Sequence, residues 1–280
     1  MRVQIISELK IPLSLKVVPL EKVVLHEQTD PRRVEKLAQR LAADGRLSNP
    51  PMVVATDDKY VVLDGATRIT ALKQMEYPHT VVQVVSENDG VSLNTWYHVV
   101  RQTPPAQLLK VLNGLPDVGI VESSSKTVLD DMYENRGLCY LHTADDKIYM
   151  VQPAFGINRH KALNRLVETY IGAGHITRTL NKNIDDLKNE YPDLSTLVVF
   201  PKYTVEQVLQ FARAGHVLPA GITRFIIPGR VLRLNADLAY LKSVDTPLSE
   251  KNEWLYQQLV DRLDKNGVRY YQEPVYLLDE

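Results

Sequence analysis

The chain has 280 residues, of which 44% are hydrophobic and 24% are charged, as in a globular protein with room for two modest domains. Its 33 lysines and arginines balance 34 aspartates and glutamates to a net charge of -1, so no overall electrostatic field favours nucleic acid or an anionic membrane. A single cysteine, Cys139, excludes an internal disulfide and a thiolate metal site, and no segment has the ~18 consecutive apolar residues of a membrane helix, so we expect a cytoplasmic protein.

The first 90 residues alternate strand-like and helical patterns. In chain order, these are a strand over 15–25 with a bend or an edge at Pro19, a helix over 31–45 capped by Asp30, strands over 52–55 and 60–63, a helix that ends near Met75, and a strand over 79–85. The sequence therefore predicts a small mixed domain over residues 1–90.

Residues 64–68, Asp64-Gly65-Ala66-Thr67-Arg68, join the strand over 60–63 to the helix that follows it. A helix N-terminus attracts anions, and glycine lets a ligand approach the backbone closely. A carboxylate, a hydroxyl and an arginine in the same turn suit a phosphate and a metal ion. An ordinary Asp-Gly turn with a Thr67 cap fits the same spacing, and both interpretations stay open. Glu27 also follows a strand, so a compact sheet can bring Glu27 and Asp64 to one edge.

The rest of the chain also mixes helices and strands, which predicts an α+β fold. Helices are expected over 92–100, 105–112, 125–135, 157–171, 205–214 and 250–264, and strands over 118–122, 138–142, 147–151, 195–200 and 268–278. We expect a second α+β domain over 91–235 and a C-terminal helix and strand extension over 236–280. Residues 218–230 hold two glycines, two prolines and two arginines and form a second candidate anion-binding segment, in which Arg230 is either a ligand or a solvated strand residue.

The order of these motifs resembles the ParB/sulfiredoxin-like nucleotide-binding superfamily. The sequence is more narrowly similar to its free L-serine kinases, of the archaeal and staphyloferrin B biosynthesis types. Those kinases have a His-Glu pair after the first strand, present here as His26-Glu27, and an Asp-Gly-x-His-Arg turn, matched by residues 64–68 except at Thr67. Their distal Pro-Ala-Gly-x-Thr-Arg-His-x-Ile-Pro-Gly-Arg segment matches residues 219–230 except at Phe225. The likeness spans about residues 15–235, and its distal part is the more specific.

The resemblance implies a kinase that phosphorylates the side-chain hydroxyl of a small free amino acid, with L-serine giving O-phospho-L-serine. Glu27 would be the general base, and Asp64 would lie near the transferring phosphoryl group and its Mg²⁺. The nucleotide, ATP or ADP, would be bound by Gly65, Ala66, Thr67 and Arg68. Substrate-binding residues would be His26, Thr223, Arg224 and Phe225. Phosphoryl transfer needs mainly positioning and charge neutralisation, which these residue types supply.

Two residues depart from the pattern of the kinases. Thr67 replaces a histidine with a hydroxyl that can still donate one hydrogen bond, and Phe225 replaces a second histidine with an aromatic wall. A different amino-acid substrate, a different nucleotide or a lost activity is compatible with these changes. The sequence therefore does not choose between ATP and ADP, and it does not define an oligomeric state.

Other members of the superfamily offer alternative functions. Sulfiredoxin chemistry requires a cysteine in the turn, where this chain has Ala66, and is excluded. A DNA-binding ParB-like protein predicts an arginine-rich turn, a helix-turn-helix and a basic face, whereas this turn has one arginine and the chain is nearly neutral, so we do not expect a nucleic-acid partner. A non-catalytic regulator that senses a nucleotide or another ligand remains the alternative to the kinase, and Mg²⁺-dependent phosphorylation of an amino acid separates the two.

Overall fold

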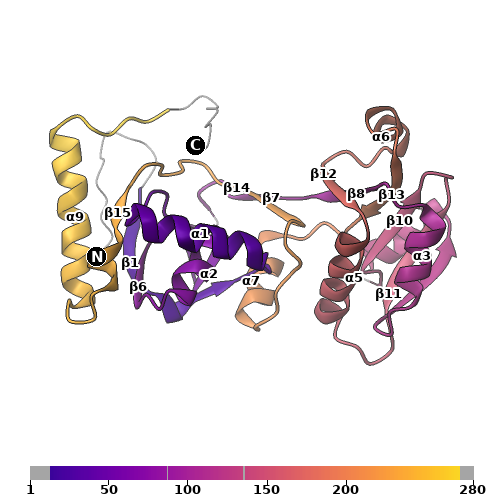
Figure 1. Ribbon diagram of the computed structural model, residues 1–280, viewed down its shortest axis with the longest axis horizontal. Coiled ribbons are helices and arrows are strands. Elements are labelled where there is room, and N and C mark those ends of the chain that lie inside the picture. Colours follow the sequence, from indigo (N-terminus) through magenta and orange to yellow (C-terminus); the bar gives the residue numbers. More distant parts are fainter. Residues whose placement is uncertain (1–12, 87, 135, 272–280) are drawn as a thin grey trace. The chain divides into compact units, whose positions relative to one another are not determined.

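The computed structural model describes residues 13–86, 88–134 and 136–271, which form two compact units (Figure 1). The first unit contains the residues up to Leu25, Thr29–Val91 and the residues from Ile227 onward. The second unit contains His26–Gln28 and Ser92–Ile226, so the chain enters it twice. This division differs from the three consecutive segments expected from the sequence, because the residues after Ile226 pack with the first unit.

A five-stranded mixed sheet forms the centre of the first unit, with the strand order β1-β6-β4-β5-β2. Its strands are β1 (Leu15–Pro19), β2 (Val23–Leu25), β4 (Met52–Ala55), β5 (Tyr60–Asp64) and β6 (His79–Val85). A 3-10 turn over Leu20–Lys22 follows Pro19 and separates β1 from β2, which lie at opposite edges of the sheet. The single strand expected over 15–25 is therefore two strands. β2 runs parallel to β5 with Leu25 beside Val62. The strands predicted over 52–55, 60–63 and 79–85 are present as β4, β5 and β6.

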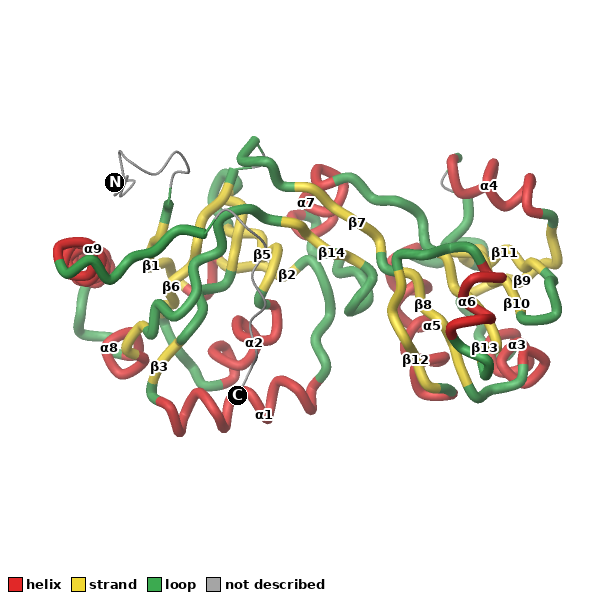
Figure 2. Tube along the Cα trace, turned by 90° about the horizontal axis from the view of Figure 1, so that it is seen from above, coloured by secondary structure: helices red, strands yellow, loops and turns green. Residues whose placement is uncertain are grey.

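Two helices of the first unit, α1 (Pro31–Asp44) and α2 (Ala66–Gln74), pack against each other (Figure 2). Local signals set the bounds of α1. The Asp30 side chain accepts a hydrogen bond from the backbone N–H of Arg32 at 2.9 Å, and Pro31 occupies the first turn. Gly45 ends the helix with a φ of 61°, in the left-handed region. The sequence predicts both ends of this helix.

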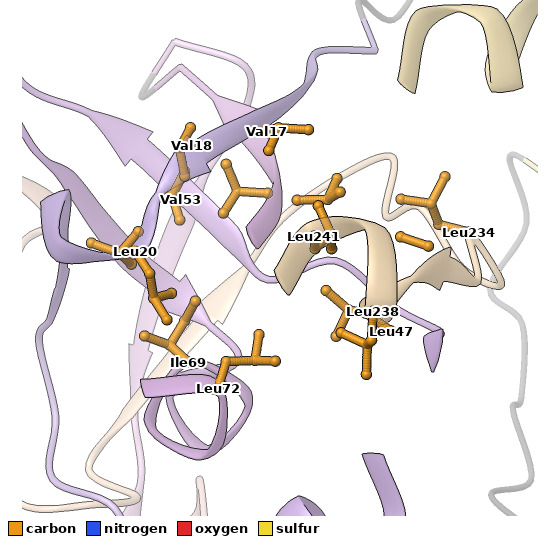
Figure 3. Close-up of a cluster of buried hydrophobic side chains, with 14 of the residues drawn as sticks. Val17, Val18, Leu20, Leu47, Val53, Ile69, Leu72, Leu234, Leu238 and Leu241 are labelled. Atoms are coloured by element: carbon orange, nitrogen blue, oxygen red, sulfur yellow. The ribbon is translucent and has the colours of Figure 1, made fainter. Parts of the chain in front are cut away.

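The C-terminal part of the first unit adds β15 (Ala236–Asp237), α8 (Leu238–Lys242) and α9 (Leu248–Asp264). β15 pairs with β3 (Arg46–Leu47), and α9 packs against β1. Figure 3 shows Ile69 and Leu72 of α2 in one buried cluster with Leu238 and Leu241 of α8. Burial of this apolar surface explains why these residues are not a separate extension. The strand expected over 268–278 lies mostly outside the described residues, and residues 268–271 form no strand.

The second unit contains a six-stranded antiparallel sheet with the order β12-β8-β13-β10-β11-β9. Its strands are β8 (Tyr97–Arg101), β9 (Val118–Ser123), β10 (Cys139–Thr143), β11 (Ile148–Pro153), β12 (His175–Thr179) and β13 (Leu194–Val199). Its helices are α3 (Pro105–Asn113), α4 (Ser125–Tyr133), α5 (Arg159–Ala173), α6 (Ile184–Glu190) and α7 (Val205–Arg213). A two-stranded ribbon pairs β7 (Ser92–Thr95) with β14 (Thr223–Ile226). Among the helices described in either unit, none has the length and apolar character needed to cross a membrane.

The helix expected over 92–100 is wrong, because this stretch forms β7 and most of β8. Side chains alternate between the two faces of β8, as in any strand. Tyr97 and Val99 belong to a buried cluster with Leu187 of α6, whereas His98 contacts Tyr170 of α5. β-Branched residues such as Val99 and Val100 favour a strand. The strands that pair with β8 come from distant parts of the chain.

Candidate active site

The turn between β5 and α2 presents backbone N–H groups at a helix start. Gly65 precedes the helix with a φ of 100°, and no side chain caps the helix there. The first intrahelical hydrogen bond runs from the Ile69 N–H to the Gly65 carbonyl at 3.0 Å, so the N–H groups of Ala66, Thr67 and Arg68 lie outside the helical ladder. The helix begins where the sequence predicts, and these groups suit an anion.

Two arginines of the first unit bind the same oxygen of Asp64. Nη2 of Arg68 donates to Asp64 Oδ2 at 2.8 Å, and Nη1 of Arg230 donates to it at 2.7 Å. Burial alone would raise the pKa of the Asp64 carboxyl, but the two guanidinium groups outweigh burial and lower that pKa. One carboxylate between two cations leaves a net positive charge, which suits a ligand with several negative charges.

Gln83 of β6 fixes the segment that carries Arg230. Its Nε2 donates to the Gly229 carbonyl at 2.8 Å, and its Oε1 accepts from the Val231 N–H at 2.9 Å. The buried Gln83 amide thus holds the backbone on both sides of Arg230. Of the two interpretations that the sequence leaves open for Arg230, the strand is wrong, because Arg230 lies outside the strands. Its side chain is exposed and forms an ion pair with Asp64, and its role as a ligand stays a prediction.

Glu27 belongs to the second unit, where its carboxylate lies among other predicted site residues. Glu27 Oε2 accepts a hydrogen bond from the Gly221 N–H at 3.2 Å and lies 3.9 Å from Nε2 of His26. His26 Nε2 is also 2.9 Å from the Thr223 hydroxyl, and the ring of Phe225 meets the His26 ring edge-on with centroids 5.2 Å apart. Four of the residues predicted from the sequence therefore lie together.

Arg224 does not join this group. It follows Thr223 in β14, so its side chain extends from the opposite side of the ribbon. The Arg224 guanidinium lies 4.8 Å from the centre of the Trp96 ring, in a cation–π contact. Trp96 thus orients the arginine, whose role in substrate binding stays a prediction.

Comparison with known proteins relates this chain to an enzyme family. No family model matches the chain. The ATP-dependent L-serine kinase SbnI of Staphylococcus aureus is 30% identical to it over 270 residues, and the aligned part covers 95% of this chain and 97% of that one. The chain belongs to the ATP-dependent L-serine kinase family. A family member from Staphylothermus marinus is 23% identical over 235 residues, covering 80% of this chain and 90% of the archaeal one.

Solved structures show the same fold as this serine kinase family member. C-terminally truncated SbnI from Staphylococcus aureus has a TM-score of 0.69 and 26% identity, covering 89% of this chain and 97% of that chain. A free serine kinase in complex with AMP has a TM-score of 0.70 at 16% identity and covers 84% of this chain and 97% of its own. The predicted α+β class and the predicted likeness to serine kinases are confirmed.

Asp64 is the carboxylate that the resemblance places near Mg²⁺, and this role stays a prediction. Within the described ranges, no group of three or more His, Cys, Asp and Glu side chains could hold a metal ion. Mg²⁺ in phosphoryl-transfer enzymes often uses one or two carboxylates together with phosphate oxygens and waters. Asp64 therefore fits a metal ion that arrives with the nucleotide, and it does not form a complete metal site of its own.

Sequence reasoning misses three residues that support these groups. Gln83 holds the Arg230 segment, and His98 and Tyr170 lie behind Gly221 in the second unit. No spacing marks Gln83 or Tyr170, which look like ordinary strand and helix residues. The pattern of residues 92–100 predicts a helix, so the sequence does not indicate that His98 lies next to Tyr170.

Proposed function

We propose that this family member transfers the γ-phosphoryl group of ATP to the hydroxyl of free L-serine, giving O-phospho-L-serine and ADP. The observation that carries the proposal is the match along 95% of the chain to an ATP-dependent L-serine kinase. The phosphate-binding features of the first unit support it, although they would also serve a nucleotide sensor. The cytoplasm, where ATP is available, is the compartment that we propose for this reaction.

The first unit supplies the groups that we assign to the nucleotide. The backbone N–H groups of Gly65, Ala66, Thr67 and Arg68 and the guanidinium groups of Arg68 and Arg230 bind the phosphates. A guanidinium has five N–H donors, and the hydrogen bonds that Arg68 makes to Asp64 and Asn49 use two different nitrogens, so donors remain for phosphate. Mg²⁺ bound to the phosphates with Asp64 as a ligand would neutralise charge on the transferred group.

The second unit supplies the groups that we assign to the amino acid. Glu27 accepts the proton of the serine hydroxyl as the hydroxyl oxygen bonds to the γ-phosphorus and the bond from that phosphorus to the bridging oxygen of ADP breaks. The N–H of Gly221 keeps the Glu27 carboxylate in place. His26, Thr223 and Phe225 line the substrate side, whereas Arg224 extends from the opposite side of the ribbon and takes no part in this arrangement.

A direct assay tests this function. Purified protein with Mg²⁺, ATP and L-serine should give O-phosphoserine, followed by phosphorus NMR, with ADP and L-threonine in parallel reactions. Replacing the base by Glu27→Gln should lower turnover ~100-fold or more, while calorimetry shows unchanged ATP affinity. Glu122→Gln, at an exposed position in β9, is the matched control and should keep the full rate. Clear ATP binding without phosphoserine in the unaltered protein would identify a nucleotide sensor, and full activity of Glu27→Gln would remove Glu27 from the base role.

A further inference from the structure

A histidine outside the predicted site connects to Glu27 through the backbone of Gly221. His98 is 1% exposed and lies between Tyr170, which is fully buried, and Gly221. His98 Nδ1 is 2.6 Å from the Tyr170 hydroxyl oxygen, and His98 Nε2 is 3.0 Å from the Gly221 carbonyl oxygen. The ring also meets Phe200 edge-on, with centroids 5.1 Å apart, which further fixes its plane.

The two hydrogen bonds determine which ring nitrogen carries the proton. The Gly221 carbonyl can only accept, so Nε2 of His98 must be the donor. In a neutral ring Nδ1 is then an acceptor, and it accepts a hydrogen bond from the Tyr170 hydroxyl. Burial lowers the pKa of His98 to about 4, so the ring is neutral at neutral pH. The Tyr170 hydroxyl thus favours the tautomer in which Nε2 of His98 carries the proton and donates to Gly221.

Gly221 is therefore held at both of its backbone groups. Its carbonyl accepts from His98, and its N–H donates to Glu27 Oε2 at 3.2 Å. Its φ of 80° lies in the left-handed region, and a Cβ here would lie 2.0 Å from Nη2 of Arg178. A side chain here would strain the backbone and displace the Arg178 guanidinium, and small rotations of the backbone would move the N–H relative to the carboxylate.

We infer that His98, with its proton placed by Tyr170, is a positioning residue for Glu27, because it fixes Gly221 and thereby the N–H that holds the carboxylate. The inference rests on the proposed function, in which Glu27 is the base. His98 itself touches neither substrate nor nucleotide in this role. Its loss should therefore slow the chemical step and leave ATP binding by the first unit unchanged.

Paired substitutions at residue 98 test the inference. His98→Gln can place an amide N–H near the position of the ring Nε2, whereas His98→Met has a similar size and no donor. We expect His98→Met to lower kcat about 10- to 100-fold, since small misplacements of a catalytic group have effects of this order, with the KM for serine and the ATP affinity within about twofold of the unaltered protein. His98→Gln should restore most of kcat. Tyr170→Phe should lower kcat in the same way, and it decides the question if His98→Met does not fold.

The possible results separate this inference from the proposed function. Full kcat in both His98→Met and Tyr170→Phe, with Glu27→Gln inactive, would overturn the positioning role alone. An equal loss in His98→Gln and His98→Met, or a parallel loss of ATP affinity, would also overturn it and indicate a structural role. Activity that survives Glu27→Gln would instead refute the assignment of the base. Nitrogen-15 NMR gives an independent readout, because a proton on Nδ1 of His98 would contradict the inferred tautomer.

Discussion

Replacement of Gln83 by methionine should loosen the segment that carries Arg230. Methionine has a similar volume and cannot form the hydrogen bonds to Gly229 and Val231, which measure 2.8 and 2.9 Å. Each lost hydrogen bond costs about 1 kcal/mol, and the two backbone groups are half-buried, so water replaces the amide only in part. We therefore expect the free energy of unfolding to fall by about 2 kcal/mol, a factor of roughly 30 in the unfolding equilibrium.

The same substitution should weaken ATP binding, because Arg230 would have to be ordered when the nucleotide binds. Ordering one long side chain costs about 1 kcal/mol, which is roughly a fivefold rise in Kd. Urea denaturation and calorimetric titration with ATP measure the two effects. Gln74→Met, at an exposed position near the end of α2, is the control. If Gln83→Met matched this control in both measurements, the Gln83 amide would not hold the Arg230 segment.

Three other substitutions test separate parts of the structure. Gly65→Ala should cost about 1–2 kcal/mol of stability and weaken ATP binding, because φ at this residue is 100° and the added Cβ would press on the Arg68 side chain; unchanged thermal unfolding and calorimetry would contradict this. His98 has a pKa of about 4 when folded and an ordinary pKa of 6.5, so the unfolded chain binds its proton more readily and stability should fall by up to about 3 kcal/mol as pH drops from 6.5 towards 4. Denaturation across this pH range should show a flatter profile for His98→Gln, and identical profiles would refute the assignment. Asp64→Asn removes the carboxylate that competes with phosphate for the two arginines, so ADP without Mg²⁺ should bind more tightly while turnover with Mg²⁺ and ATP falls; weaker binding of metal-free ADP would contradict this competition.

Elements with strong local signals are predicted well from the sequence. The cap Asp30, Pro31 and the terminal Gly45 set the bounds of α1, and their contacts lie within a few residues along the chain. The helix over 205–214 likewise begins at a capping box formed by Thr204 and Gln207. These signals do not depend on the rest of the fold.

Features set by distant contacts are predicted poorly. The stretch over 92–100 becomes two strands because β8 pairs with β12 and β13, which lie about 80 to 100 residues later in the sequence. Arg230 reaches its partner Asp64 across 166 positions of sequence, and His98 reaches Gly221 across 123. The motifs shared with serine kinases identify His26, Glu27, Thr223 and Phe225. They do not include His98 or Tyr170, which support Gly221.

The short segment His26–Gln28, which belongs to the second unit, limits where the chain can be cut into fragments. Glu27 and Gln28 pair with Leu218 of the second unit, yet the chain on either side of them belongs to the first. A gene fragment that encodes residues 92–226 would keep His98, Gly221 and Thr223 and would lack the proposed base. The two units therefore cannot be exchanged between proteins as independent modules, and a working hybrid would have to take residues 26–28 from the same parent as the second unit.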